Sequence, residues 1–216
     1  MQILEIMQAR HSVRKYMNRT IETEKRESLQ KLVKECNKES GLNIQILFDE
    51  FKCFNSMMAR YGKFSGVSNY IALVGKKGAD LEEKAGYYGE KLVLAAQKMG
   101  LNTCWVAMTH GKSAAEIGKG EKQACLIALG YGENQGVPHA VKNLNEVCDT
   151  ENMPDWFARG MEAVMLAPTA MNQQKFYFML DGDTVLAKVN GRGFYVKMDL
   201  GIVKYHFEAV TGKKVM

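Results

Sequence analysis

Apolar positions along this chain follow two spacings, one typical of helices and one typical of strands. The clearest helical spacing is that of Tyr88, Leu92, Ala95 and Met99, which repeat at i, i+4, i+7 and i+11 and so share one face of a helix. Gly100 follows directly, and glycine is the usual residue for the left-handed turn that ends a helix. The pattern predicts a long amphipathic helix that stops near residue 100.

Shorter helical spacings, apolar alternation and compact apolar runs occur along the rest of the chain. The predicted helices are 3–9, 23–40, 155–166 and 198–211, and the predicted strands are 43–51, 70–74, 101–108, 124–131, 175–180 and 184–189. These helices and strands mix without a regular β-α-β alternation. The sequence therefore predicts an α+β fold with a mainly antiparallel sheet flanked by helices.

Two stretches carry more specific expectations about packing. Gly86 and Gly89 keep part of the long helix small, so another helix or a flat ligand can approach it closely. Residues 52–68 are poorly patterned and contain Met57, Met58, Tyr61 and Phe64, which suit either an apolar cover over a pocket or irregular core. We expect core, because methionine is a common gap-filler.

The stretch 134–154 is rich in turn-forming residues (Gly136, Pro138, Asn143, Asn145 and Asn152), and it predicts a junction between two parts of the chain, residues 1–150 and 151–216. With 216 residues the chain is long enough to bury a substantial core. We expect the two parts to interleave as one compact unit.

Composition narrows the class of protein. Hydrophobic residues at 46% and charged residues at 25% are ordinary for a soluble protein, and no apolar run approaches the roughly 20 residues that span a bilayer. The N-terminus has no apolar core typical of a secretory signal, which favours the cytoplasm. The net charge of +5 is scattered and forms no nucleic-acid module. Five widely spaced cysteines without a C-x-x-C pair predict free thiols and no structural metal site.

Most motifs of enzyme chemistry are absent from the sequence. It has no G-x-S-x-G, no H-E-x-x-H and no Walker A motif, and the glycines at 130, 132 and 136 miss the dinucleotide fingerprint by one position. The four histidines are isolated, and isolated histidines are more often structural than catalytic. Cys104, next to Trp105, is expected to be a small buried residue because free cysteine is among the most buried types.

A basic segment near the N-terminus offers binding chemistry. Arg10 and Arg14 are spaced i, i+4, so on a helix end they would share one face. Together with the Ser12 hydroxyl they could hold a phosphate by charge-assisted hydrogen bonds. The alternative is a solvated basic helix terminus.

The stretch from Ala167 to Phe178 is a second candidate for binding. Pro168 cannot continue the helix before it, so that helix should stop near Leu166. Thr169 and the amides that follow then offer hydroxyl and amide groups on irregular backbone, where binding groups are usually carried.

Three segments together resemble the flavin-dependent nitroreductase family: 10–16 (RHSVRKY), 100–105 (GLNTCW) and 167–174 (APTAMNQQ). Members typically carry an R-[RH]-S-x-R segment, a GLGTCW-like turn and an A-P-S-x-x-N-x-Q-P-W loop. The resemblance implies an α+β fold that binds FMN, with NAD(P)H as a transient electron donor. No side chain is then needed as a catalyst, because the flavin N5 carries the chemistry.

The resemblance also implies which residues bind the cofactor. The first segment would contact the phosphate and ribityl chain, the backbone after the turn would lie near the flavin N5, and the loop would cover the flavin. A basic residue before residues 143–147 is a further phosphate candidate. The implied residues are Arg10, His11, Ser12, Arg14, Ala107, Met108, Lys142, Pro168, Thr169, Ala170 and Asn172.

One departure from the family is the position of the loop, which here comes after residue 160 instead of soon after the N-terminal segment. In the family it usually reaches the flavin of a partner subunit. We expect a single-chain pseudo-dimer in which residues 1–150 supply the phosphate and N5 sides and residues 151–216 supply the covering loop. A monomer is thus favoured over a homodimer. Lys175 and Phe176 replace the family's Pro-Trp, which leaves the substrate side open.

The expected activity is reduction of an electron-poor acceptor, such as a nitroaromatic or a quinone, in ping-pong order with NAD(P)H. A flavin-binding or flavin-storage protein with little reductase activity is the first alternative, and an interaction domain without flavin is the second. No nucleic-acid or membrane partner is expected.

Overall fold

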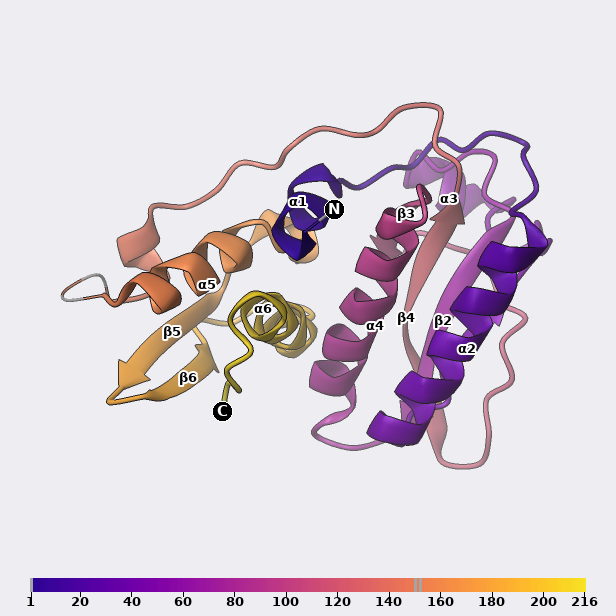
Figure 1. Ribbon diagram of the computed structural model, residues 1–216. Coiled ribbons are helices and arrows are strands. Elements are labelled where there is room, and N and C mark those ends of the chain that lie inside the picture. The colour runs from indigo at the N-terminus through magenta and orange to yellow at the C-terminus, as the bar shows by residue number, and fades with distance from the viewer. Residues whose placement is uncertain (1, 150, 152) are drawn as a thin grey trace.

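The computed structural model describes residues 2–149, 151 and 153–216. Its larger sheet has four strands in the order β1-β2-β4-β3, and every neighbouring pair is antiparallel (Figure 1). The strands are β1 (Gln45–Leu47), β2 (Asn69–Lys76), β3 (Asn102–Val106) and β4 (Glu121–Gly130). β3 is an edge strand, so its outer side is available to segments from elsewhere in the chain.

Two helices, α2 (Thr23–Ser40) and α4 (Leu81–Lys98), cover one face of this sheet in Figure 1. Ile71 and Leu73 of β2 pack with α4 residues in one apolar cluster. Because side chains alternate along a strand, Tyr70 and Ala72 face the other way, where they pack with Phe54 of the irregular segment that carries α3 (Met57–Tyr61). The central strands are therefore buried on both faces.

The C-terminal part packs on the side of α4. A long connector leads from β4 through η1 (Leu144–Glu146) to α5 (Asp155–Met165), which is followed by η2 (Ala170–Asn172), the hairpin β5 (Phe176–Asp181) and β6 (Thr184–Val189), and α6 (Val196–Thr211). In Figure 1, α6 lies between α4 and the hairpin. Phe157, Phe178 and Phe207 bring α5, β5 and α6 into one apolar cluster.

The two parts are joined by α1 and by a close helix crossing. α1 (Ile3–Ala9) packs on both, because Ile6 and Met7 share a cluster with Leu94 of α4 and Ala163 of α5. At the crossing of α4 and α6, a Cβ on Gly86 would overlap the carbonyl oxygen of Met198, and a Cβ on Gly201 of α6 would overlap the carbonyl oxygen of Glu83. The expectation of a close approach at Gly86 is confirmed, and the partner is a helix.

The architecture confirms the predicted α+β fold with antiparallel strands flanked by helices. The predicted helix and strand positions are confirmed with shifts at their ends, the largest being that of the strand predicted at 43–51. β1 ends at Leu47, and soon after it Asp49 adopts a left-handed φ of 56°. The Asp49 carboxylate pairs there with Arg26 of α2, which fixes this turn.

The expectation that residues 52–68 form irregular core is wrong for three side chains and right for one. Met57, Met58 and Tyr61 are 83%, 45% and 80% exposed, whereas Phe64 is buried. The reason is a short helix that the sequence pattern did not indicate: the Ser56 hydroxyl accepts a hydrogen bond from the backbone of the first turn, and α3 is too short to bury a full apolar face.

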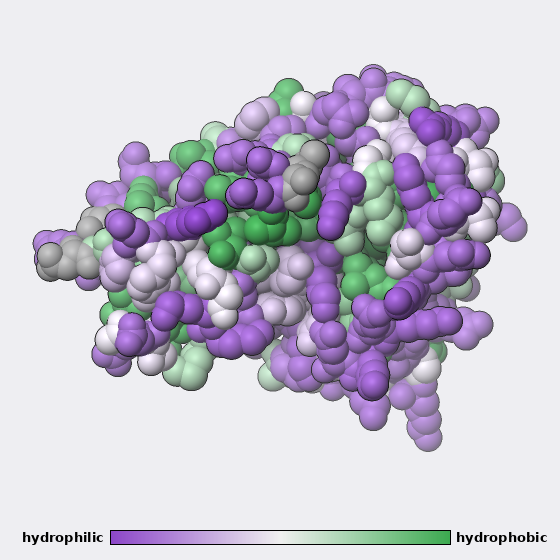
Figure 2. All heavy atoms as spheres, viewed as in Figure 1, coloured by the Kyte–Doolittle hydropathy of each residue, from purple (hydrophilic) through white to green (hydrophobic). Residues whose placement is uncertain are grey.

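The face of the protein shown in Figure 2 is mostly hydrophilic, and the cysteines are buried. Hydrophilic residues cover most of the face in Figure 2, and apolar residues surface in the middle of the view. All five cysteines are buried free thiols, which confirms that expectation. Within residues 2–149, 151 and 153–216, no helix is long and apolar enough to cross a membrane, and no three His, Cys, Asp or Glu side chains gather as a metal site.

Candidate functional site

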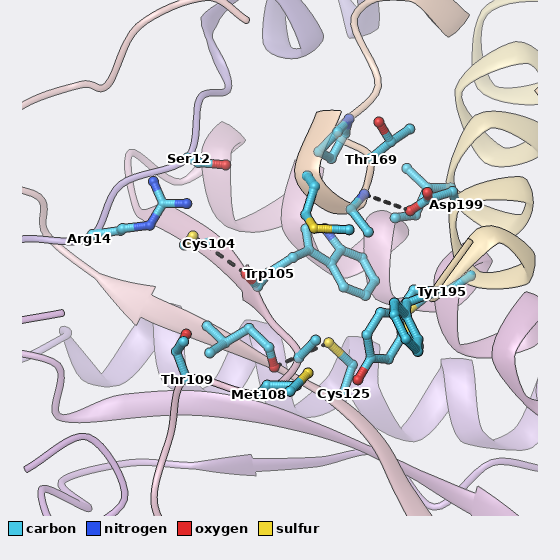
Figure 3. Close-up of a pocket in the computed structure, with 18 of the residues that line it drawn as sticks. Ser12, Arg14, Cys104, Trp105, Met108, Thr109, Cys125, Thr169, Tyr195 and Asp199 are labelled. Carbon is cyan, nitrogen blue, oxygen red and sulfur yellow. Dashed lines mark hydrogen bonds between the residues drawn. The ribbon is translucent and has the colours of Figure 1, made fainter. Parts of the chain in front are cut away.

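A cavity of about 320 Å³ lies between the end of β3, the start of α6 and the loop after α5 (Figure 3). This volume falls within the range of about 300–1,000 Å³ typical of small-molecule sites. We call it the central cavity. Most of its wall is apolar, and it comes from segments far apart in the sequence, namely Ser12 and Arg14, residues 104–109, residues 168–171 and parts of 194–202, with Phe64 and Cys125.

Ser12 and Arg14 reach this cavity because the N-terminal segment pairs with the outer edge of β3. The backbone N–H of Val13 donates to the carbonyl of Thr103 at 3.0 Å. The Val13 side chain is buried, so in an extended segment its two neighbours point to the opposite side. The guanidinium carbon of Arg14 lies 5.9 Å from the centre of the Phe64 ring.

The helix-face argument for the basic segment is wrong, although two of its residues do line the cavity. α1 ends at Ala9, and Arg10 already has an extended backbone (φ −80°, ψ 115°). Arg10 and Arg14 therefore do not share a helix face. Arg14 is exposed and lines the cavity, whereas Arg10 is only 3% exposed and does not line it.

Ala107 and Met108 line the cavity directly after β3 ends at Val106. Met108 is 66% exposed, and Met171 and Phe194 on other segments are 81% and 74% exposed. All three line the cavity. They give the cavity an apolar rim that is open to solvent.

The loop of residues 168–174 forms the wall opposite Arg14. Pro168, Thr169, Ala170 and Met171 line the cavity. Met171, like two other residues of this loop, has a left-handed φ, here 52°, which non-glycine residues seldom adopt. The loop closes on itself, since the Thr169 hydroxyl accepts from the backbone N–H of Gln174 at 3.1 Å.

Asp199, in the first turn of α6, anchors this loop from the other side. Its Oδ1 accepts from the backbone N–H of Ala170 at 2.9 Å, and its Oδ2 accepts from the side-chain amide of Gln173 at 2.7 Å. Burial raises the pKa of Asp199 to about 6, and these two hydrogen bonds oppose that rise. Among the described residues that line the cavity, Asp199 is the only carboxylate (Figure 3).

The two thiols in the wall are poor nucleophile candidates. Cys104 and Cys125 are 2% and 3% exposed. Burial raises the pKa of both, to about 12 for Cys125. Since the thiolate is the reactive form, both act as small apolar residues, which confirms the expectation for Cys104.

Arg10 and His11 line a neighbouring cavity of about 260 Å³, which also includes His139. The Arg10 Nε lies 4.0 Å from a Glu90 carboxylate oxygen and has no hydrogen-bond partner among the described residues. Burial lowers the pKa of Arg10, and Glu90 opposes this. Burial and then the charge of Arg10 also lower the pKa of His11 and His139. This cavity therefore holds a buried cation with unused hydrogen-bonding capacity.

Lys142 and Asn172 lie outside the central cavity and tie the connector to the 168–174 loop. The Lys142 ammonium donates to the carbonyl of Gln174 at 3.1 Å, and the Asn172 amide donates to the carbonyl of Ala140 at 2.7 Å. Both side chains are thus used in holding the chain together. Of the eleven candidate residues, the structure brings seven to the central cavity and places four elsewhere: Arg10, His11, Lys142 and Asn172.

A buried polar network lies behind the cavity wall. The Trp105 indole donates to Glu90 Oε2 at 3.0 Å, and Nε2 of His206 lies 3.0 Å from Glu90 Oε1. The other ring nitrogen of His206 lies 2.8 Å from the carbonyl of Ala163. Glu90 and His206 are fully buried, so the network connects α4, α6 and α5 directly behind Trp105.

Sequence reasoning missed Asp199 and the Glu90 network. One signal for Asp199 was available, because it lies four residues before Val203 and so falls on the apolar side of the last helix. An acidic residue at such a position is a candidate for a functional carboxylate. No comparable signal pointed to Glu90, whose partners come from distant segments.

Comparisons with known proteins agree with this architecture. The family model described as "Putative TM nitroreductase" matches residues 2–211. A crystal structure of a "putative nitroreductase" from Thermotoga maritima is 22% identical, with a TM-score of 0.74 over 97% of this chain and 83% of that one. A comparison with curated proteins found no match.

Two shorter proteins match with lower scores. A "Putative NADH dehydrogenase/NAD(P)H nitroreductase" from Bacteroides thetaiotaomicron is 21% identical, with a TM-score of 0.54 over 68% of this chain and 96% of that one. A nitroreductase family protein from Streptococcus pneumoniae is 13% identical, with a TM-score of 0.54 over 69% of this chain and 100% of that one. At such identities the likeness shows a shared fold.

Proposed function

Because the chain belongs to the "Putative TM nitroreductase" family, we propose that it is an FMN-dependent oxidoreductase. In this proposal NAD(P)H donates hydride, and a small electron-poor acceptor such as a nitroaromatic or a quinone receives it. One observation carries the proposal: Ser12 and Arg14, residues 107–108 and residues 168–170 meet at one cavity. The first and third of these belong to segments that resemble the flavin-binding segments of the family, and residues 107–108 follow directly after the second such segment, 100–105.

The residues present fit the chemistry of FMN. The central cavity offers an apolar wall for a flat ring, with the Ser12 hydroxyl and the Arg14 guanidinium as polar groups at one end (Figure 3). The neighbouring cavity holds Arg10, whose buried Nε lacks a hydrogen-bond partner among the described residues, together with His11 and His139. A phosphate group is a chemically suitable ligand for the Arg10 guanidinium, and the two imidazoles offer further hydrogen-bonding nitrogens. We assign the ring to the central cavity and the phosphate to the side of Arg10.

Bound FMN would supply hydride transfer, and the residues of this chain would bind, orient and shield it. Arg14 places a positive charge beside the cavity, which stabilises negative charge on a reduced ligand there. Met108, Met171 and Phe194 form an apolar rim that limits water at the open side. No acidic or basic catalyst is assigned in this scheme.

We further propose that one chain forms one complete site. Residues 1–150 supply Ser12, Arg14 and the end of β3, and residues 151–216 supply the 168–174 loop and the start of α6. The two shorter proteins above match over nearly their whole length but cover only about two thirds of this chain, with 68% and 69%. This supports the pseudo-dimer interpretation, in which the additional part of this chain replaces a partner subunit.

The proposal is tested by an absorbance spectrum of the purified protein with and without NADH or NADPH under anaerobic conditions. We expect yellow protein, or protein that turns yellow with added FMN, and bleaching of the flavin bands by the reduced nicotinamide. Protein that binds no FMN would refute the proposal. Protein that binds FMN but is not bleached by either nicotinamide would instead be a flavin-storage protein.

A further inference from the structure

Asp199 is the strongest unassigned feature of the central cavity, because it is a buried carboxylate whose two oxygens hold the same loop. It is 2% exposed. One oxygen accepts from the backbone of Ala170 and the other from the side chain of Gln173, and the Gln173 amide also donates to the carbonyl of Phe194 at 2.9 Å. The carboxylate therefore ties the loop to the start of α6 and to the segment that precedes this helix.

The loop needs such a tie because its backbone is strained. Met171, Asn172 and Gln174 have left-handed φ values of 52°, 53° and 45°. Such conformations are unfavourable for residues with a Cβ, and they persist only where the surroundings hold them. On the connector side the amides of Asn172 and Gln174 donate to the carbonyl of Ala140. On the cavity side the holding group is Asp199.

The carboxylate is retained at a cost to stability. Burial raises its pKa to about 6, above the value of about 3.9 expected in an unfolded chain. The folded protein thus binds a proton more tightly than the unfolded one, so near neutral pH the buried charge opposes folding, and this opposition disappears as the pH falls below about 6. A group kept ionised in a cavity despite such a cost is a candidate for a functional role.

We propose that Asp199 is a positioning residue that, in its ionised form, fastens residues 170–173 as one wall of the central cavity and so makes ligand retention there depend on protonation. Identification of the ligand as FMN rests on the function proposed above. The loop donates two hydrogen bonds to Asp199, from the Ala170 N–H and the Gln173 amide. When the carboxylate is protonated, one of these two donors loses its acceptor. The loop then relaxes from its strained backbone and the cavity loses that wall.

Other ionisable groups near Asp199 do not account for a change between pH 5 and 7.5. Cys104, Cys125 and Tyr195 share the cavity wall, and burial raises the pKa of each above its ordinary value. On α4, which packs against α6, Glu83 pairs with Lys204 of α6 at 2.8 Å.

Arg14, the other charged side chain that lines the cavity, lies at its opposite end. The histidines His11 and His139 lie in the neighbouring cavity, and wild type and variants all keep them. Ratios between proteins at one pH therefore cancel a contribution that these histidines make to every protein equally.

The first test follows amide hydrogen exchange of the loop in the protein without added ligand, in Asp199→Asn and in Glu208→Gln. Glu208 is a control carboxylate on the same helix, which accepts from Tyr87, Lys214 and Val215 and does not line the cavity. Protection factors of residues 170–174 should fall about tenfold in Asp199→Asn at pH 7.5, because a charge-assisted hydrogen bond becomes a neutral one. At pH 5 wild type and Asp199→Asn should converge, and Glu208→Gln should follow wild type at both values.

The second test measures FMN affinity by quenching of flavin fluorescence, and the melting temperature in parallel. The dissociation constant of Asp199→Asn should exceed that of wild type about tenfold at pH 7.5 and approach it at pH 5. The ligand-free variant should melt no lower than wild type at pH 7.5, because a buried charge has been removed. A purely structural role predicts a lower melting temperature and loss of protection throughout α6, and that result would overturn the proposal.

The two tests separate this proposal from the proposed function. Wild-type protein that binds no FMN at either pH refutes the flavin assignment, and the exchange experiment still decides the role of Asp199. Equal loop protection in wild type and Asp199→Asn at pH 7.5 refutes the role of Asp199, whatever the protein binds. A Gln173→Ala variant tests the direction of the effect. The hydrogen bond from Gln173 lowers the pKa of Asp199, so its loss should raise that pKa, and loop protection should be lost at a higher pH than in wild type.

Discussion

Arg14 is held at the cavity by its backbone more than by its side chain. The carbonyl of Arg14 accepts from the N–H of Ser65 at 3.0 Å, and the N–H of Tyr16 donates to the carbonyl of Ser65 at 2.9 Å. On the other side, Val13 is bonded to β3. The guanidinium is left exposed and available to a ligand.

We therefore predict that Arg14→Gln weakens FMN binding about tenfold or more, because hydrogen bonds to a charged group contribute about 1.5–3 kcal/mol. The melting temperature should not change, since the side chain is exposed. Titration of FMN against each variant checks this, with Lys15→Gln as the control, because Lys15 is also exposed but does not line the cavity. Equal losses in both variants would show that only the net charge of the segment matters.

Trp105 links the cavity wall to the buried carboxylate of Glu90 through its indole N–H. Without this donor, one oxygen of the fully buried Glu90 carboxylate loses its hydrogen bond. An unsatisfied buried polar group costs about 1–3 kcal/mol. Trp105→Phe should lower the free energy of unfolding by about that amount. Urea denaturation followed by circular dichroism measures it.

A matched control exists in Trp156→Phe. Trp156 packs edge-on against Phe157 and Phe207, and these contacts need no indole N–H. It should lose less stability than Trp105→Phe. If the two variants are equally destabilised, the bond to Glu90 makes no net contribution and Trp105 matters only through its packing.

At the scale of the elements, the crossing of α4 and α6 depends on two glycines that face the opposite backbone. Gly201→Ala would place a Cβ against the carbonyl oxygen of Glu83, and backbone cannot move aside as a flexible side chain can. We predict a loss of about 1–3 kcal/mol or more in the free energy of unfolding, although alanine is the better helix former.

Gly118→Ala is the control for that substitution, because the nearest atoms to a Cβ at Gly118 belong to the side chain of Glu121 and not to backbone. Thermal denaturation of both variants measures the difference in their stability. A Gly201→Ala protein as stable as Gly118→Ala would mean that the two helices separate without cost and that the parts of the chain are only loosely joined.

The elements differ in how far the sequence predicts them. α4 and α6 follow from local spacing, because residues of one helix face lie three or four apart and show the period directly. α3 does not follow from local spacing, because its side chains are mostly exposed. Its cap is a local hydrogen bond to the Ser56 side chain, which leaves no apolar pattern in the sequence. The spacing of apolar residues therefore predicts helices that bury one face, and it does not predict helices that remain mostly exposed.

The same distinction applies to the candidate site. Ser12, Arg14 and residues 168–170 were identified by resemblance to known motifs, and their meeting at one cavity depends on tertiary packing that no local pattern encodes. Arg10 belongs to the same motif, but its backbone is extended at the end of α1, and its side chain lines the neighbouring cavity instead of the central one. The predicted helix end was right, and what the sequence did not show was the path of the chain after it.

The whole molecule forms its cavity between two parts that are consecutive in sequence. Trp105, in the wall, packs with apolar residues of both parts. The crossing of α4 and α6 fixes the distance between β3 and the start of α6, and these two elements carry opposite walls. Both parts of this chain line the cavity, which is the basis for our proposal that one chain forms one site.

This arrangement predicts a monomer that holds one FMN. Light scattering coupled to gel filtration should give a mass near 24.3 kDa, and flavin released by denaturation should amount to one FMN per chain. The Gly201→Ala variant tests whether the helix crossing matters for the site. Because the substitution loosens the crossing that positions both walls, the variant should hold less flavin and should still be a monomer. A stable dimer with one FMN per two chains would show that the second part of this chain does not replace a partner, and the single-chain site would have to be abandoned.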